Sequence, residues 1–330
     1  MTKSYHVVGI GNAIVDVLAH ADDSFLDHMG IEKGIMQLVE KTRAETLYAA
    51  MEARAQIAGG SVANTLAGLG NLGLDTGFVG RVRDDALGRF YAAEMEADGT
   101  RFLNPPVAGD PLPTSRSMIF VTPDGERSMN TYLGISAEVG EADVPQGDVA
   151  AARVLFLEGY LYDKPQGKRA FQAATRACHA AGGRAGIALS DPFCVDRHRD
   201  DFRALVRDEM DYVIGNQQEW MSLYQTADLE NALAHARADC EMVVCTRSGD
   251  PVVLIRGDER VAVPVRKVVP VDATGAGDQF AAGFLYGYVT GAPLERCGRM
   301  GVAAAAEVIG HMGARPEADL KALFAGHGLI

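Results

Sequence analysis

Short runs of apolar residues alternate with longer segments of helical periodicity along this 330-residue chain. The apolar runs predict strands over Tyr5–Gly11, Thr76–Gly80, Val154–Leu157, Arg184–Leu189, Tyr212–Ile214, Met242–Thr246 and Val252–Ile255. The periodic segments predict helices over Ser61–Leu72, Asp85–Ala97, Asp278–Val289 and Gly301–Ile309. The last two are apolar on nearly every side, so we expect them to be buried. This alternation predicts an α/β fold with a mostly parallel sheet covered by helices on both faces.

One segment, Pro113–Tyr132, departs from the alternation. Two stretches of strand-forming residues flank Thr122-Pro123-Asp124-Gly125, a sequence typical of a tight turn. It therefore predicts an antiparallel hairpin, which in an α/β chain usually belongs to an added sheet. Ile14–Ala19 and Ile35–Val39 could pair with this hairpin. We expect a single domain over residues 1–330, with a small β lid formed by about 13–40 and 105–135.

Charge and cysteine content narrow the class of protein. The 31 basic and 44 acidic side chains give a net charge of −13, which disfavours a nucleic-acid partner because such binding needs clustered Lys and Arg. The five cysteines show no Cys-x-x-Cys pair and no zinc-ligand spacing, so a reducing compartment explains them most simply. No signal-peptide pattern is visible, and no apolar stretch approaches the roughly 20 residues of a membrane span. We expect a cytoplasmic protein without membrane or nucleic-acid partners.

The strongest chemical signal is Val271-Asp272-Ala273-Thr274-Gly275-Ala276-Gly277-Asp278, immediately before a long apolar helix. The small residues Gly275, Ala276 and Gly277 allow a sharp turn that brings successive N–H groups near one point, and the helix adds its positive dipole end. The segment therefore suits an anion such as a phosphate. Asp278 would lie beside that phosphate and could accept the proton of an attacking hydroxyl. The alternative, in which Asp278 only caps the helix, explains less well why two Asp residues bracket the loop.

Two earlier segments could contact a substrate. Ala58-Gly59-Gly60-Ser61-Val62-Ala63-Asn64 is a loop entering a helix, where paired glycines let a ligand approach closely and Asn64 could bond a hydroxyl. Taken alone, it is also typical of a turn with a helix cap. Gly11-Asn12-Ala13-Ile14-Val15-Asp16 follows the first strand and lacks the third glycine of a dinucleotide-binding fingerprint. Asp16 fits either a polar group aimed into a cleft or a structural aspartate.

Two later segments stand at the ends of predicted strands. Asn216-Gln217-Gln218-Glu219 offers amide and carboxylate oxygens of the kind that organise Mg²⁺ near phosphates, although a solvated loop acid is the alternative. Thr246-Arg247-Ser248-Gly249 is a strand-end turn of the kind where α/β folds bind ligands. The absence of a Walker A sequence argues against a P-loop kinase.

In this order the five segments resemble the ribokinase-like family of carbohydrate and nucleoside kinases, the PfkB family, over essentially the whole chain. The resemblance implies an ATP-dependent phosphotransferase with a three-layer αβα domain and a β lid. It implies an anion hole formed by Gly275, Ala276 and Gly277, with Asp278 as the catalytic base. Substrate contacts are implied for Asn12, Asp16, Gly59, Gly60, Ser61 and Asn64. Contacts to ATP are implied for Asn216, Thr246, Ser248, Gly249 and Thr274, and a Mg²⁺ site, bound through water, for Asn216 and Glu219.

Within that family the sequence is most similar to adenosine kinases, in segments such as Leu112-Pro113-Thr114 and Leu189-Ser190-Asp191-Pro192-Phe193. It differs from related kinases where Ala188, Val302 and Met36 stand at places that are often polar. We therefore expect a kinase that phosphorylates the 5′-hydroxyl of a ribonucleoside, with adenosine first. A sugar kinase acting on ribose, fructose or a relative is the main alternative, and a non-catalytic binding protein is a third.

The acceptor should be uncharged. No Lys or Arg lies within Gly59–Asn64 or Gly11–Asp16, so an already phosphorylated sugar would find no clamp there, although Arg116 is a nearby basic candidate. Met36 and Phe193 are expected to face the nucleobase of the acceptor, because flexible apolar and aromatic surfaces suit a flat purine. A monovalent cation such as K⁺ is a further candidate cofactor. Relatives of this kind occur as monomers and as lid-mediated homodimers, and both states stay open.

Overall fold

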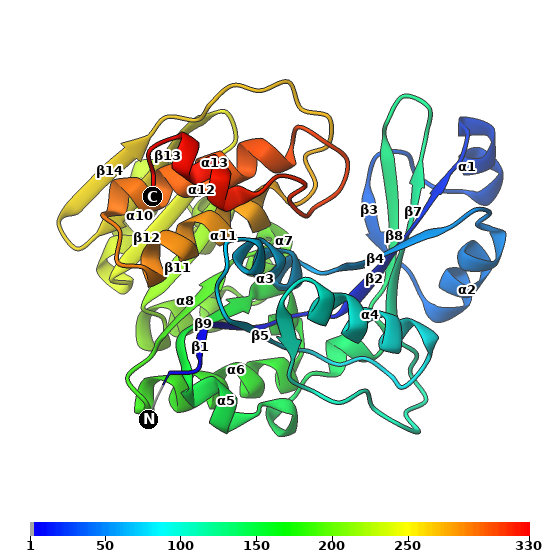
Figure 1. Cartoon of the computed structure of the whole chain (residues 1–330), viewed down its shortest axis with the longest axis horizontal. Coiled ribbons are helices and arrows are strands. Elements are labelled where there is room, and N and C mark those ends of the chain that lie inside the picture. The colour runs from blue at the N-terminus through cyan, green and yellow to red at the C-terminus, as the bar shows by residue number, and fades with distance from the viewer. Residues whose placement is uncertain (1–2) are drawn as a thin grey trace.

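The computed structural model describes residues 3–330 and contains one large and one small sheet (Figure 1). The nine-stranded large sheet is parallel except at β13, which pairs antiparallel with both its neighbours. In spatial order its strands are β14 (Glu259–Val263), β13 (Asp250–Arg256), β12 (Met242–Arg247), β11 (Tyr212–Asn216), β10 (Arg184–Ala188), β9 (Ala152–Glu158), β1 (Tyr5–Ile10), β5 (Thr76–Val79) and β6 (Thr100–Phe102). Every strand that the apolar runs predicted is present.

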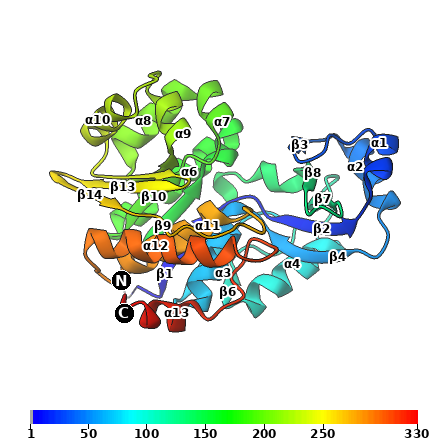
Figure 2. The same ribbon diagram turned by 90° about the horizontal axis from the view of Figure 1, so that it is seen from above.

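Helices cover both faces of the large sheet and enclose two cores (Figure 2). Neighbouring strand residues alternate between them: Val7 and Val154 pack into one core, Val8 and Leu155 into the other. The first core is covered by α3 (Ser61–Asn71), α4 (Ala86–Ala97), α11 (Ala276–Val289), α12 (Leu294–Val308) and α13 (Leu320–Gly326). The second is covered by α5 (Gln146–Ala150), α6 (Pro165–Ala180), α7 (Pro192–Arg197), α8 (Arg199–Glu209), α9 (Gln217–Leu223) and α10 (Leu229–Asp239). The predicted three-layer αβα class is therefore confirmed.

Two predicted helices begin earlier than expected. α12 starts at Leu294 rather than Gly301, because its first turns bury Leu294, Cys297 and Met300 while exposing charged residues between them. The all-apolar pattern that predicted this helix therefore covers only its second half. α11 starts at Ala276, two residues before the predicted start at Asp278. Short 3₁₀ helices complete the fold: η1 (Gly134–Glu138), η2 (Glu141–Asp143) and η3 (Gly159–Asp163).

The small sheet has five strands, in the spatial order β3 (Met36–Leu38), β8 (Arg127–Tyr132), β7 (Ser115–Val121), β2 (Ile14–His20) and β4 (Ala55–Gly59). The predicted antiparallel hairpin is confirmed as β7 and β8, and the expected partners β2 and β3 each pair with it in parallel. One face of this sheet is covered by α1 (Asp23–Met29) and α2 (Lys41–Ala50).

The strand β4 corrects the expected composition of the small sheet. It lies outside the two segments, about 13–40 and 105–135, that were predicted to form it, and residues 105–114 add no named strand. Ala55-Gln56-Ile57-Ala58-Gly59 has a single large apolar side chain and ends in glycine. It therefore shows too little alternation to predict a strand, and only its pairing with β2 reveals it.

Residues 3–330 include no helix with both the length and the apolar character needed to cross a bilayer. All five cysteines are buried thiols. Burial raises the pKa of Cys240 to about 12, so this thiol stays protonated. Cys240 and Cys245 both belong to the second core.

Glycines allow α11 and α12 to pack closely. A Cβ atom on Gly283 would lie 2.3 Å from the carbonyl oxygen of Met300, and one on Gly287 would lie 2.9 Å from the Cα of Cys297. Both distances are shorter than non-bonded atoms adopt, so these two positions need glycine. The close contact fixes α11, whose first turn carries Asp278.

We expect Gly283→Ala to lower the free energy of unfolding by at least about 1–3 kcal/mol, the usual cost of overpacking. Gly147→Ala is the matched control, because Gly147 is exposed in α5 and a Cβ there meets open space. That change should be neutral or stabilise by up to about 1 kcal/mol. Urea denaturation of both variants measures the difference, and equal effects would show that the α11–α12 contact tolerates a side chain.

Candidate active site

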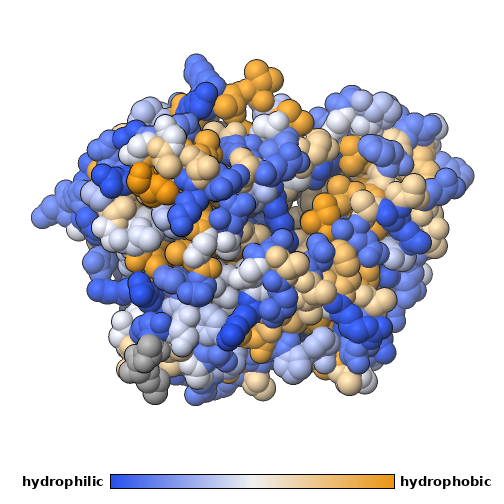
Figure 3. Space-filling model, viewed as in Figure 1, coloured by the Kyte–Doolittle hydropathy of each residue, from blue (hydrophilic) through white to orange (hydrophobic). Residues whose placement is uncertain are grey.

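A cavity of about 560 Å³ lies between the two sheets, at the carboxyl ends of the parallel strands. Its wall is formed by the small sheet, the first turns of α3 and α11, and the segments that follow β9, β10 and β11. Figure 3 shows apolar side chains exposed where the small sheet meets the larger part of the molecule. Such strand ends are where open α/β sheets bind ligands.

The cavity brings together most of the residues predicted from sequence. Those that line it are Asn12, Asp16, Gly60, Ser61, Asn64, Asn216, Glu219, Thr246, Thr274, Gly275, Gly277 and Asp278. The predicted residues that do not line it are Gly59, Ala276, Ser248 and Gly249. Ser248 and Gly249 lie in the exposed turn that joins β12 to β13.

Asp278 is held by the first turn of α3. Its Oδ1 accepts a hydrogen bond from Ser61 Oγ at 2.6 Å, and its Oδ2 accepts one from Asn64 Nδ2 at 2.9 Å. The backbone carbonyl of Asp278 also accepts from Thr65 Oγ1 at 3.1 Å. Ser61 and Asn64, predicted to contact the substrate, are thus bound to the predicted base in this structure.

Burial raises the pKa of Asp278 to about 6, although the hydrogen bonds from Ser61 and Asn64 lower it in part. A carboxylate with a pKa near 6 is ionised at neutral pH and still binds a proton more readily than an ordinary aspartate. This is the property that a general base needs near pH 7. The geometry therefore suits Asp278 to accept a proton from a hydroxyl in the cavity.

The segment before Asp278 forms a tight loop whose shape Asp272 fixes. Gly275 adopts a left-handed conformation at φ +79°, where a Cβ would lie 2.6 Å from the backbone of Ala314. Asp272 Oδ1 accepts from Thr274 N at 3.0 Å, and its Oδ2 lies 3.0 Å from Arg127 Nη2 of the small sheet. The loop leads directly into the 14-residue helix α11, whose positive dipole end faces the cavity. It can therefore hold an anion there.

Asp16 enters the cavity from β2 of the small sheet, and both early glycines are needed around it. A Cβ on Gly59 would lie 2.4 Å from Asp16 Oδ2, so Gly59 makes room for the carboxylate although it does not line the cavity. Gly60 has φ +102°, and a Cβ there would lie 2.2 Å from the Asn12 carbonyl oxygen. Burial raises the pKa of Asp16 to about 7, an effect that the positive charges of Arg315 and Arg127 oppose.

Asn216 and Glu219 pair with each other. Glu219 Oε2 accepts from the Asn216 backbone N–H at 2.8 Å and Asn216 Oδ1 accepts from Glu219 N at 2.9 Å, which forms a capping box at the start of α9. Glu219 Oε1 also accepts from Asn216 Nδ2 at 2.6 Å. Burial raises the pKa of Glu219 to about 7. Within residues 3–330 no group of three His, Cys, Asp or Glu side chains has metal-binding geometry. A Mg²⁺ ion here would therefore need oxygens from a bound phosphate or from water in addition to these two residues.

Two residues of the wall were missed by the sequence analysis. Glu158 ends β9 with both carboxylate oxygens turned toward Asn12 and α3. An acid directly after the predicted apolar strand Val154–Leu157 was a signal that could have identified it. Tyr160 follows in η3, and its hydroxyl donates to the Ser190 carbonyl at 3.1 Å. No local sequence pattern indicated where Tyr160 would point.

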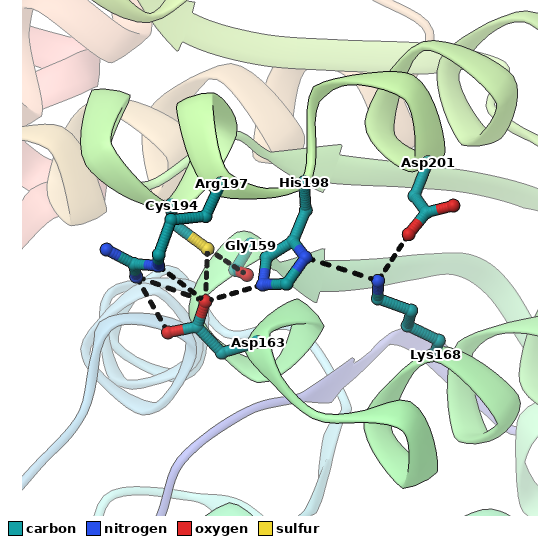
Figure 4. Close-up of polar contacts among 7 residues, drawn as sticks. All are labelled: Gly159, Asp163, Lys168, Cys194, Arg197, His198 and Asp201. Carbon is teal, nitrogen blue, oxygen red and sulfur yellow. Dashed lines mark hydrogen bonds and ion pairs between the residues drawn. The ribbon is translucent and has the colours of Figure 1, made fainter.

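The basic side chains Lys164 and Arg197 of the cavity wall are already paired, and Figure 4 shows the contacts of Arg197. Arg197 of α7 contacts both carboxylate oxygens of Asp163, at 3.0 and 2.8 Å from its Nη2, and His198 lies 2.9 Å from the same carboxylate. Lys164 forms an ion pair with Glu138. Asp163 and Glu138 therefore neutralise the charges of Arg197 and Lys164 within the protein.

A buried carboxylate beside a helix N-terminus, in a cavity between an α/β sheet and a small sheet, is an arrangement that suits phosphoryl transfer. The family model that matches residues 32–320 is described as "pfkB family carbohydrate kinase". The chain therefore belongs to the pfkB family of carbohydrate kinases, and it is an ATP-dependent kinase of that family.

Solved structures similar to this chain carry two kinds of name. A probable sugar kinase from Rhizobium etli CFN 42 is 44% identical, with a TM-score of 0.91 and 100% of each chain covered. An adenosine kinase from Sinorhizobium meliloti is 46% identical, with a TM-score of 0.89 and 99% of each chain covered. Among curated proteins, an uncharacterized sugar kinase from Archaeoglobus fulgidus is 28% identical over 75% of this chain and 96% of its own length.

We expect Asp278→Asn to lower kcat by about 10²–10⁴, the usual contribution of a positioned base, with the KM for ATP little changed. In the wild type, kcat should fall as the pH drops through about 6, because the pKa of Asp278 is raised to that value and protonation removes the base. Asp228→Asn is the control, since Asp228 caps α10 at the surface. A folded Asp278→Asn variant with wild-type turnover would remove Asp278 from the mechanism.

The rate should require Mg²⁺, and Glu219→Gln should raise the Mg²⁺ concentration needed for half-maximal rate, because an amide is a weaker metal ligand than a carboxylate. Initial rates over a Mg²⁺ titration measure this shift. Glu230→Gln, at an exposed ion pair with Arg260, serves as the control. If the Mg²⁺ dependence of Glu219→Gln matches that of the control, the metal prediction for this segment is wrong.

Proposed function

We propose that this kinase transfers the γ-phosphoryl group of ATP to the 5′-hydroxyl of a ribonucleoside, with adenosine as the first acceptor. The observation that carries this proposal is the composition of the cavity wall. The polar side chains of Asp16, Asn64 and Asp278 share it with Met36 and Leu38, which are 50% and 60% exposed. The hydroxyls of a ribose could bond the three polar side chains, and the flat face of a purine could pack against Met36 and Leu38.

The aromatic side chain that would stack on the purine of the acceptor is Tyr160 rather than Phe193. Phe193 was expected to face the base, but it is 71% exposed on α7 and does not line the cavity. Tyr160 lines the cavity, is 39% exposed, and is held by its hydrogen bond to Ser190. A purine could stack on its ring.

In the proposed step the carboxylate of Asp278 takes the proton of the acceptor hydroxyl as the hydroxyl oxygen bonds to the γ-phosphorus. The bond between that phosphorus and the β–γ bridging oxygen breaks, and ADP leaves with the electron pair. The backbone of Gly275–Gly277 and the start of α11 would stabilise the charge on the phosphoryl oxygens. Asp16 would bind the vicinal hydroxyls of the ribose, since its carboxylate accepts two hydrogen bonds.

The adenine of ATP has a candidate site separate from the first cavity. A second cavity of about 630 Å³ lies between α12 and the segment after β14, with Val263, Val268, Val302 and Ala303 in its wall. The same segment continues along the chain to Asp272, where the loop before Asp278 begins. Val302 would make this contact apolar. Thr246 and Thr274 face the first cavity, where the phosphates would lie.

The acceptor is proposed to be uncharged. Among the described residues the cavity wall contains the basic side chains Lys164 and Arg197, and both have carboxylate partners. Arg116, the basic candidate from sequence, instead lies with its guanidinium carbon 4.7 Å from the centre of the Tyr48 ring. It belongs to the face of the small sheet that α2 covers. A phosphorylated sugar would therefore have to displace an existing ion pair.

Asn216 and Glu219 would hold a Mg²⁺ ion through water, and the ion would offset the negative charge of the ATP phosphates. A monovalent cation such as K⁺ stays a prediction. A monomer and a lid-mediated homodimer both fit the proposed chemistry.

A sugar acceptor such as ribose or fructose is the second candidate. The similarity to a probable sugar kinase over the whole chain favours it. Against it, a free sugar would leave Met36, Leu38 and Tyr160 without an apolar partner in the cavity.

A coupled assay of ADP release over a panel of nucleosides and sugars tests the acceptor class. We expect kcat/KM for adenosine to exceed the values for ribose and fructose, because only a nucleoside covers the apolar wall. If a free sugar gives the higher value, the nucleoside proposal fails and the sugar kinase takes its place.

Asp16→Ala should cost about 2–5 kcal/mol in transition-state stabilisation, as when a buried charged hydrogen-bond partner is removed. The loss in kcat/KM on replacing adenosine by 2′-deoxyadenosine or 3′-deoxyadenosine should also become smaller in this variant for whichever hydroxyl Asp16 binds. Asp124→Ala, in the exposed β7–β8 turn, is the control. An unchanged loss for both deoxynucleosides would show that Asp16 does not bind the ribose hydroxyls.

A further inference from the structure

The chain passes four times between the small sheet and the rest of the molecule. These crossings lie between β1 and β2, between β4 and α3, just before β7, and just after β8. Each of the four contributes to one buried group of polar atoms around the carboxylate of Glu158: the side chains of Asn12, Ser115 and Ser136 and the backbone N–H of Val62. Glu158 itself belongs to β9, in the middle of the large sheet.

One oxygen of Glu158 organises three of the crossings. Its Oε1 accepts from the Asn12 backbone N–H at 2.7 Å and from Asn12 Nδ2 at 2.6 Å. Asn12 Oδ1 accepts a hydrogen bond from Ser136 Oγ at 2.9 Å, and Ser136 Oγ lies 3.0 Å from Ser115 Oγ. All four side chains are buried, so no water competes for these hydrogen bonds.

The other oxygen of Glu158 holds the start of α3. Its Oε2 accepts from Val62 N at 3.3 Å. The residue before the helix is Gly60, which has no side chain to cap the first turn, and Glu158 supplies that acceptor from another strand. Gly11 packs directly against it, since a Cβ there would lie 2.5 Å from Glu158 Oε2.

The first turn of α3 is also the turn that holds Asp278, through Ser61 and Asn64. We propose that Glu158 is a positioning residue: its carboxylate fixes the four crossings and the first turn of α3, and so keeps Ser61 and Asn64 where they orient Asp278. This inference rests on the proposed role of Asp278 as the base.

Glu158 is better suited to this role than to direct contact with a substrate. It lines the cavity but is only 1% exposed. Both of its oxygens are occupied by N–H groups of the protein. A substrate hydroxyl could reach it only by displacing one of those donors, which would leave a buried N–H group without a partner.

The test is Glu158→Gln, which keeps the size of the side chain but places an NH₂ group against one of the N–H donors. We expect kcat to fall about 10–100-fold, as small displacements of a catalytic group do, with the KM for ATP unchanged. In an Asp278→Asn background the same change should cost less than about 3-fold, because residues that act through one another are not additive. Glu158→Asp, which keeps the charge but is one methylene shorter, should give a partial loss and remains usable if Glu158→Gln does not fold.

Asp211→Asn controls for lost stability. Asp211 also accepts three hydrogen bonds, from Ala185 N, Arg184 and His179, but it precedes β11 at the amino end of that strand, whereas the cavity lies at the carboxyl end. The Asp211→Asn variant should have a lower melting temperature than the wild type but an unchanged kcat.

Equal fractional losses from Glu158→Gln in the wild-type and Asp278→Asn backgrounds would overturn the inference, as would a loss confined to the KM of the acceptor. In both cases the role of Asp278 would stand. An Asp278→Asn variant with wild-type turnover would instead overturn the proposed step and this inference together.

Discussion

The two hydrogen bonds from Ser61 and Asn64 to Asp278 hold the site together. They join the first turns of α3 and α11, which are more than two hundred residues apart in the chain. Gln279 of α11 adds a further link by donating to the Asn64 carbonyl at 2.8 Å. As a result, two helix N-termini face one buried carboxylate, and their dipoles favour its charged form where burial opposes it. A base that is ionised yet easily protonated follows from this balance.

The phosphate side of the site is connected to the small sheet by an ion pair. Arg127 of β8 lies 3.0 Å from Asp272, and both side chains are largely buried. Asp272 also accepts from Gly313 N at 2.8 Å, so it ties together the anion loop, the segment after α12 and the small sheet. Removing one partner of a buried pair is costly, which gives the position of the small sheet a direct influence on the anion loop.

Local signals sufficed for the fold and for much of the site. The parallel strands, the β7–β8 hairpin and the loop before Asp278 all follow from short sequence patterns. What could not be predicted depends on contacts between distant segments. Strand β4 has too few apolar residues to be recognised alone, and the capping box turns Asn216 and Glu219 toward each other. The partners of Ser61 and Asn64, and the position of Arg127 beside Asp272, arise only when helices and sheets pack.

The ionisation of Asp278 tests this balance most directly. In protein labelled with ¹³C at the aspartate carboxyl carbons, the Asp278 signal can be assigned by its loss in Asp278→Asn and followed from pH 3 to 9. A titration midpoint near 6 is expected, because burial outweighs the two hydrogen bonds. A midpoint at or below the ordinary aspartate value of about 3.9 would contradict it, since the carboxylate would then be too weak a base to take a proton from a hydroxyl near neutral pH.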